Sequence, residues 1–97
     1  MIIVMATMVT KPEKKAALQG FAKELIDTTR KESGCISYEL FAALEEDNRV
    51  LFVERWESKQ ALDAHSQTPH FLRFGASCAE LLQKVPEVVV YEAEPLQ

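Results

Sequence analysis

The sequence has few glycines and no excess of basic residues, and each shortage excludes or disfavours a class of protein. Only 3 glycines occur among 97 residues, so the chain has no glycine-rich loop of the kind that cradles nucleotide phosphates in Rossmann and P-loop proteins. The 11 Lys and Arg residues against 15 Asp and Glu residues give a net charge of −4. That balance disfavours binding to nucleic acid or to an anionic membrane surface, because both attract basic proteins.

The chain also lacks a segment typical of a signal peptide or a membrane span. Its most apolar stretch, residues 1–9, has no basic residue and is too short to cross a bilayer. We therefore expect a cytoplasmic protein in which Cys35 and Cys78 stay reduced. Neither cysteine has an activating neighbour, so we expect both to be unreactive packing residues.

What is present suffices for one globular domain over residues 1–97. The chain is 47% hydrophobic and 27% charged, which is ordinary for a folded domain. Hydrophobic periodicity and turn residues predict four strands, at residues 2–9, 36–43, 49–56 and 88–94. They predict a first helix that runs from a capping box at residues 10–13 to about residue 31, and two further helices at residues 58–66 and 68–85. This order predicts an α+β, ferredoxin-like fold, a split βαβ arrangement with helices on one face of an antiparallel sheet.

Three of the predicted strands are apolar on both faces. Residues 2–5, 50–53 and 88–91 show no alternation of apolar and polar side chains, whereas a sheet with one wet face should alternate. The predicted helices can cover only one face. We therefore expect a second copy of the chain to cover the other face, which makes the protein a homodimer.

The third strand carries two candidate site residues. Glu54 and Trp56 are two residues apart, so they share one face of the strand with Phe52. A carboxylate on an apolar face is unfavourable unless it is paired, so Glu54 is either a structural ion-pair or hydrogen-bond partner or an acid–base group. Trp56 is either a core residue or a surface on which a planar ligand stacks.

Two histidines follow in the helical segment. His65 lies on the apolar side of a short helix, where it either seals the corner between two helices or serves as a general base. His70 is at the start of the next helix, where a local structural contact is the main interpretation and substrate binding the other. The spacing of five residues, interrupted by Pro69, predicts no metal site, because two metal-binding histidines on one helical turn are four apart.

Aromatic side chains provide candidate walls for a substrate pocket. Phe71 and Phe74 lie on one face of the predicted helix 68–85, Phe21 faces them from the first helix, and Tyr38 lies on the second strand. Together they could line an apolar pocket suited to a flat molecule.

The chain resembles the antibiotic-biosynthesis monooxygenase domain family, and within it the quinol monooxygenase branch. The resemblance is carried by Glu32-Ser-Gly-Cys35 with Tyr38, by Glu54-Arg-Trp-Glu-Ser58, and by His65-Ser-Gln-Thr-Pro-His70-Phe71. It covers nearly the whole chain. It implies a dimeric α+β barrel with one pocket per subunit between sheet and helices, and oxidation of a quinol or other small phenolic or polycyclic substrate by O2 without metal or flavin.

The candidate base is His65, with Glu54 as its orienting partner or as the next candidate for the base. The candidate substrate contacts are Trp56, Tyr38, His70, Phe71, Phe74 and Phe21. Haem-degrading relatives place an iron-ligating His where this chain has Gly75, which disfavours haem chemistry. Two alternatives stay open: a non-catalytic dimeric module that binds small molecules, and an enzyme that degrades or isomerises a small phosphorylated signalling sugar, for which only Arg73 would be near the pocket.

Overall fold

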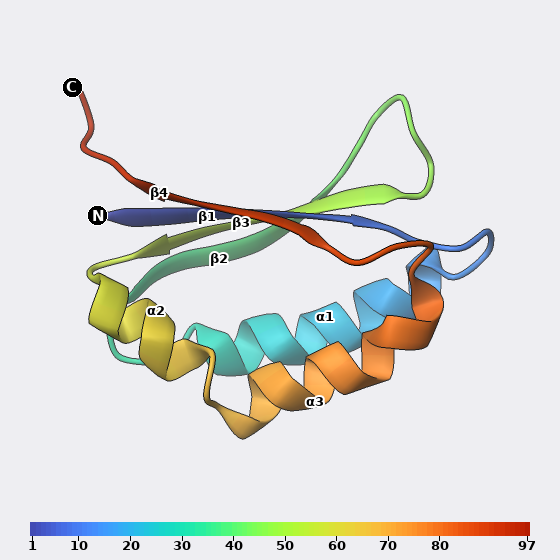
Figure 1. Cartoon of the computed structure of the whole chain (residues 1–97), viewed down its shortest axis with the longest axis horizontal. Helices are drawn as coiled ribbons and strands as arrows, with labels where there is room; N and C mark the ends of the chain where they lie inside the picture. Colours follow the sequence, from blue (N-terminus) through green and yellow to red (C-terminus); the bar gives the residue numbers. More distant parts are fainter.

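Four strands form one antiparallel sheet in the order β2-β3-β1-β4 (Figure 1). The computed structural model describes all of residues 1–97. The strands are β1 (Ile2–Val9), β2 (Cys35–Ala42), β3 (Arg49–Trp56) and β4 (Glu87–Glu92). The first and third strands are central, as is usual in a split βαβ arrangement, and each strand lies within two residues of its predicted bounds.

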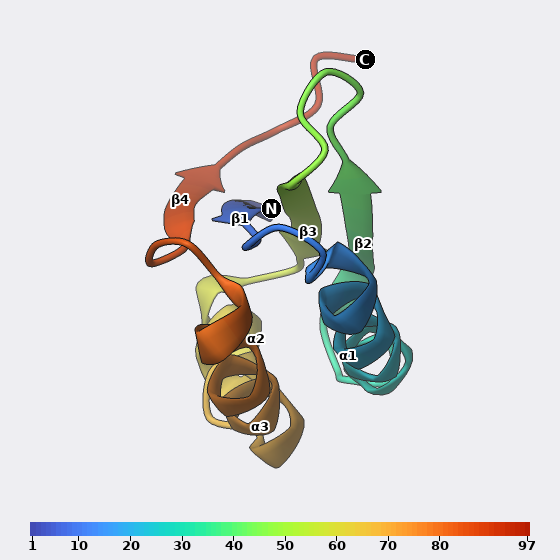
Figure 2. The same ribbon diagram turned by 90° about the vertical axis from the view of Figure 1, so that its right-hand side faces the viewer.

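The helices all lie on one face of this sheet. They are α1 (Lys15–Thr29), α2 (Lys59–His65) and α3 (Pro69–Cys78), and a short 3₁₀ turn, η1 (Ala79–Leu81), follows α3. Seen end on, α1 lies beneath β2, while α2 and α3 lie beneath the β1–β4 side (Figure 2). The α+β, ferredoxin-like fold is therefore confirmed. None of the helices is both long and apolar enough to cross a membrane.

The two helices that carry the histidines begin at capping residues. The Ser58 hydroxyl accepts a hydrogen bond from the Ala61 amide at 3.1 Å, and the Thr68 hydroxyl accepts one from the Phe71 amide at 3.3 Å. Pro69 occupies the first turn of α3, where its missing N–H leaves no hydrogen bond unmade. The Thr68 hydroxyl also donates to the His65 carbonyl at 2.7 Å, which ties the end of α2 to the start of α3.

The predicted capping box at residues 10–13 is wrong. Thr10 is fully buried, and its hydroxyl donates to the Asn48 carbonyl at 3.2 Å instead of capping a helix. Helix α1 begins only at Lys15 and has no side-chain cap. The contact that determines the role of Thr10 comes from a residue 38 positions away, which local spacing cannot indicate.

The last helix is also shorter than predicted. It ends at Cys78, with η1 carrying the turn to Leu81, rather than at Val85, which is 84% exposed. Leu82 pairs with Thr10 in an isolated antiparallel β-bridge, and the backbone N–H of Gln83 donates a hydrogen bond to the Val9 carbonyl at 2.8 Å. These bonds to the end of β1 draw the chain out of the helical conformation before the apolar periodicity ends.

The core lies between the sheet and the helices. Leu18, Ala22 and Leu25 of α1 are buried, together with Phe52 and Trp56 of β3 and eleven further residues that include Val4, Tyr38, Phe74 and His65. Phe21, at the edge of the same helical stripe, is 41% exposed.

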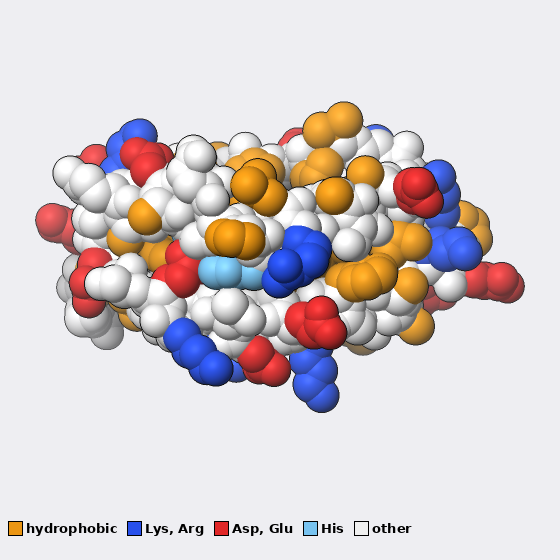
Figure 3. Space-filling view, turned by 90° about the horizontal axis from the view of Figure 1, so that it is seen from below, with side chains coloured by type: hydrophobic (Ala, Val, Ile, Leu, Met, Phe, Trp, Pro, Cys, Tyr) orange, Lys and Arg blue, Asp and Glu red, His pale blue; other side chains and the backbone are white.

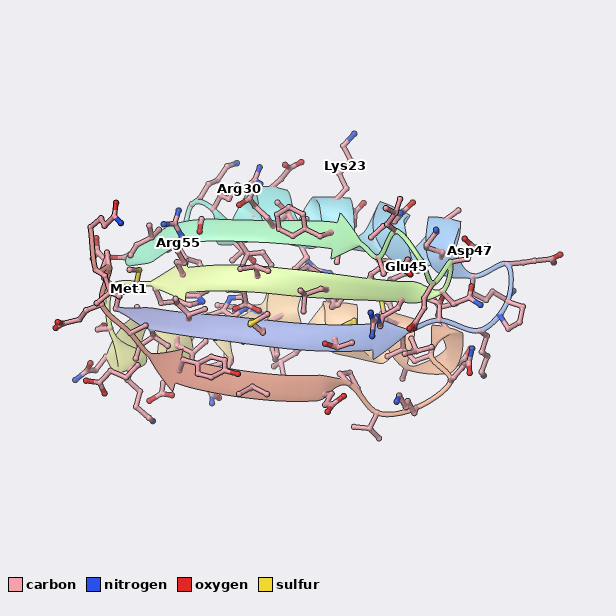
Figure 4. The ribbon with its side chains drawn as sticks, turned by 90° about the horizontal axis from the view of Figure 1, so that it is seen from above. Met1, Lys23, Arg30, Glu45, Asp47 and Arg55 are labelled. Carbon is pink, nitrogen blue, oxygen red and sulfur yellow. The ribbon has the colours of Figure 1, made fainter.

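The other face of the sheet carries no helix (Figure 4). Strand pairing places Met5 between Val53 and Val89, and Ile3 beside Tyr91. Met5 of the central strand β1 is 37% exposed, and Val89 and Tyr91 of the edge strand β4 are 43% and 48% exposed. The predicted apolar character of both faces is therefore present in the structure, and the chain itself leaves this face of the sheet uncovered.

Candidate active site

A cavity of about 380 Å³ lies between the sheet and the helices α2 and α3. Most of its 19 lining residues are hydrophobic. The lining comprises Val4, Ala6, Met8, Tyr38, Phe52, Glu54, Leu62, Asp63, His65, Ser66, Phe71, Phe74, Gly75, Cys78, Ala79, Leu82, Pro86, Val88 and Val90. A mostly apolar cavity of this size with a few polar groups is typical of a small-molecule site.

His65 is one of the polar groups of this cavity and is almost completely buried, with 1% of its surface exposed. Its ring is enclosed by Trp56, Phe71 and Tyr38, with ring centres at 4.8, 4.9 and 5.3 Å. Its Nε2 atom is buried and has no hydrogen-bond partner. The atom has almost no exposed surface, so a hydroxyl group of a bound molecule could pair with it only after one of the enclosing rings shifts.

The other ring nitrogen of His65 is held by Glu32, in the turn between α1 and β2. Oε2 of Glu32 lies 2.7 Å from Nδ1 of His65 and 2.7 Å from Nε2 of His70. An ionised carboxylate can only accept hydrogen bonds, so both ring nitrogens donate to it. His65 then carries its proton on Nδ1, and its Nε2 keeps a free electron pair.

The turn that brings Glu32 to α2 depends on a glycine. Gly34 has φ of +84°, and a Cβ atom there would lie 2.5 Å from the Cβ of Ala61. The positive φ disfavours any other residue, and the close approach to α2 excludes a side chain. Gly34 therefore allows the segment carrying Glu32 to pack directly against α2.

Glu54 also lines the cavity and is 5% exposed. Its Oε1 atom accepts a hydrogen bond from the Trp56 indole at 3.0 Å. Burial raises the pKa of Glu54 to about 7, the negative charge of Glu32 adds to that rise, and the Trp56 hydrogen bond opposes it. Glu54 is therefore poised to take up or release a proton near neutral pH.

Burial also shifts the pKa values of two other residues of the cavity, His65 and Tyr38. Burial lowers the pKa of His65 below its ordinary value, and the hydrogen bond that its Nδ1 donates to Glu32 opposes that change. His65 is thus neutral at pH 7. Burial raises the pKa of the Tyr38 hydroxyl far above its ordinary value, so that group stays protonated and can donate a hydrogen bond.

The structure brings together five of the eight predicted site residues. Tyr38, Glu54, His65, Phe71 and Phe74 all line the cavity.

The other three predicted residues do not line it. Trp56 is fully buried behind His65 and belongs to the core. Phe21 and His70 line a separate groove of about 410 Å³ on the outer side of α1 and α3, with Arg73 among its other residues. Figure 3 shows a histidine side chain at the surface of this helical side, next to basic and apolar side chains. The helical period shows which residues share a face of a helix, but it does not show whether that face meets the inner cavity or the outer groove.

The predicted pairing of His65 with Glu54 is not seen, because His65 is bonded to Glu32 and Glu54 to Trp56. Sequence reasoning left Glu32 without a role, although Glu32 opens the Glu32-Ser-Gly-Cys35 segment that carries the family resemblance. That segment was the only signal that could have identified it.

Glu32, His65 and His70 also form a set of potential metal donors, with one donor atom from each within 4.8 Å of the others. The two histidines come together although they are five residues apart, since both reach one oxygen atom of Glu32. The arrangement is that of a carboxylate accepting two hydrogen bonds, and a metal ion would have to replace both. We assign no metal ion to these residues.

No lysine or arginine lines the cavity. A phosphorylated sugar needs cationic partners for its dianion, and Arg73 lies in the outer groove instead. The cavity therefore suits an uncharged aromatic molecule better than a phosphorylated one.

Comparison with known proteins is consistent across sequence and structure. The family model described as "Antibiotic biosynthesis monooxygenase" matches residues 1–77. The chain is 38% identical to the "Uncharacterized protein sll1783" of Synechocystis over 99% of this chain, and it spans only 65% of that protein's length. It is 37% identical to the "Putative monooxygenase Rv0793" of Mycobacterium tuberculosis, over 92% of this chain and 87% of that one.

Two further similarities complete the comparison. The "Probable quinol monooxygenase YgiN" of Escherichia coli is 35% identical over 72% of this chain and 77% of its own. The crystal structure of Rv0793 superposes with a TM-score of 0.91 at 32% identity, covering 97% of this chain and 95% of that one.

Proposed function

The chain belongs to the antibiotic biosynthesis monooxygenase family, and we propose that it is a cofactor-independent monooxygenase that oxidises a quinol or another small phenolic or polycyclic substrate with O2. The observation that carries this proposal is the apolar cavity lined by His65, whose Nε2 atom is unpaired, and by the buried carboxyl group of Glu54. The similarity to relatives named as monooxygenases supports the reaction class.

In the proposed reaction, Nε2 of His65 removes the proton of a substrate hydroxyl group. The resulting anion passes one electron to O2, which gives superoxide and a substrate radical. The two radicals combine at a ring carbon to form a carbon–oxygen bond, and the peroxide oxygen recovers the proton from His65. Loss of water then leaves one oxygen atom on the ring, so that quinol and O2 give a hydroxylated quinone and water.

The cavity supplies what this sequence of steps requires. Its apolar walls, among them Phe71 and Phe74, offer an apolar surface to a flat ring and would limit the access of water to the radical pair. The Tyr38 hydroxyl, which stays protonated, can donate a hydrogen bond to a second oxygen of the substrate. Glu54 is the second candidate for the base, because its pKa lies near neutrality.

The proposal predicts catalytic oxygen consumption with at least one member of a panel of quinols and polyphenols. We expect turnover measured with an oxygen electrode to persist after exhaustive chelation, since no step uses a metal ion. A protein that binds quinols, as judged by a rise in melting temperature, but consumes no oxygen would instead be a binding module. Turnover that chelation abolishes and one metal restores would contradict the cofactor-independent mechanism.

A matched pair of glycine variants ties that activity to the cavity. Gly75 lines the cavity from α3, whereas Gly20 is exposed on α1, and a Cβ atom at either position meets nothing within 4 Å. Both Gly→Leu changes favour the helix by up to about 1 kcal/mol. We expect Gly75→Leu to fill the cavity and suppress turnover while Gly20→Leu leaves turnover unchanged. Equal turnover in the two variants would place the reaction elsewhere.

We further propose that the protein is a homodimer, forming the dimeric α+β barrel through the open face of the sheet. The support is the row of exposed apolar side chains on that face, including Met5, Val89 and Tyr91. Light scattering at micromolar concentration should give about 22 kDa, twice the 11.0 kDa of one chain, with an interface of roughly 2,000 Å². Tyr91→Lys should shift the mass toward that of one chain. A wild-type protein that stays monomeric and soluble would disprove the proposal.

A further inference from the structure

Glu32 lies between two histidines that face different surroundings. His65 is 1% exposed and lines the inner cavity, whereas the side chain of His70 is 14% exposed and lines the outer groove. One carboxylate oxygen bonds both rings at 2.7 Å. His70 therefore lies on the side of Glu32 that faces the outer groove and not the inner cavity.

The charges of Glu32 and His70 have opposite effects on the protonation of His65. The negative carboxylate of Glu32, in direct contact with Nδ1, stabilises the positively charged form of the His65 ring. A positive charge on His70, whose ring centre is 6.1 Å from that of His65, destabilises the same form. A charged His70 also draws the shared oxygen more strongly and weakens its bond to His65.

We propose that Glu32 and His70 are positioning residues for His65. Glu32 fixes the tautomer of the His65 ring and makes His65 a stronger base, whereas a protonated His70 makes His65 a weaker base. This inference rests on the proposed function in naming His65 as a base. The hydrogen-bonded chain itself is independent of any substrate. Neither residue needs to touch the reacting molecule, since both act through the imidazole of His65.

Other titratable and charged residues lie near His65 and His70, and they also influence the pH at which His65 titrates. Those that face His65, apart from Glu32 and His70, are Tyr38, Glu54 and Asp63. Those that share the outer groove with His70 are Glu24, Asp27 and Arg73. Arg73 lies in the groove without a hydrogen bond to Glu32, so Arg73→Ala removes a nearby positive charge and leaves the hydrogen-bonded chain intact.

The test is a pH titration of the histidine ring nitrogens by NMR in protein without substrate. In the wild type we expect His65 to show a protonated Nδ1 and an unprotonated Nε2. Glu32→Gln should move the His65 titration to lower pH by about one unit. His70→Ala should move it to higher pH, and Arg73→Ala should move it much less than His70→Ala.

Shifts in opposite directions for Glu32→Gln and His70→Ala support the inference, because a merely structural role would lower the melting temperature without moving the titration. If Glu32→Gln does not fold, the surface variant His70→Ala decides alone. The inference is overturned if the titration of His65 is unshifted in His70→Ala, or if the neutral His65 ring of the wild type carries its proton on Nε2. The NMR result stands even if no quinol is oxidised, so failure of the proposed function would be seen separately as absent oxygen uptake.

Discussion

Replacing His65 by Ala is expected to lower turnover by ~10²-fold or more, the usual loss when a general base is removed. The expectation follows from the unpaired, buried Nε2 atom on a side chain that lines the cavity. The wild-type rate should rise with pH through an inflection below the ordinary histidine value, because burial lowers the pKa of His65. The variant should lose that inflection. Steady-state oxygen uptake between pH 5 and 9 measures both effects.

A purely structural role for His65 predicts a different result. Loss of its hydrogen bond to Glu32 would then lower the free energy of unfolding by ~1–3 kcal/mol while turnover per folded molecule stayed the same. His65→Gln is the matched control, since its side-chain amide can still donate a hydrogen bond toward Glu32 but cannot act as a base. If His65→Gln keeps native turnover, His65 is a structural residue at the corner of the helices and Glu54 becomes the candidate base.

Replacing Glu54 by Gln is expected to remove a large part of the pH dependence of stability. Burial raises the pKa of Glu54 from 4.5 to about 7, so the folded protein binds a proton that the unfolded chain releases between these values. The stabilisation from this group is therefore complete below about pH 4.5 and is lost as pH rises to about 7. The shift corresponds to a loss on the order of 3 kcal/mol above pH 7.

Urea unfolding of the wild type and of Glu54→Gln at several pH values between 4.5 and 8 measures this contribution. The variant should gain stability relative to the wild type as pH rises, because a neutral amide stays in the cavity wall at every pH. Glu57→Gln, an exposed carboxylate three residues further along the chain, should change little. A Glu54→Gln protein whose stability runs parallel to that of the wild type would show that Glu54 titrates normally.

Turnover of the same variant separates the two candidate bases. If His65 is the base, Glu54→Gln should alter the rate less than His65→Gln and should leave the inflection assigned to His65 in place. If Glu54 is the base, Glu54→Gln abolishes turnover and His65→Gln does not.

The sequence by itself determined the elements whose signals are local. Strand parity alone places Phe52, Glu54 and Trp56 on one face of β3, because side chains alternate along any strand. Ser58 and Thr68 cap their helices through bonds to amides three residues away, so their spacing carries the information. The motifs that run from Glu32 to Phe71 likewise indicated the family without knowledge of the fold.

Contacts between distant segments were decided only by the tertiary structure. Glu32 bonds His65 and His70 across 33 and 38 residues, and no local pattern distinguishes that partner from Glu54. Thr10 follows a capping pattern yet bonds Asn48 instead. Phe21 and Phe74 share an apolar helical pattern, but only Phe74 lines the inner cavity. A helical or strand period reports which residues share a face, whereas the packing of whole elements against one another determines what that face meets.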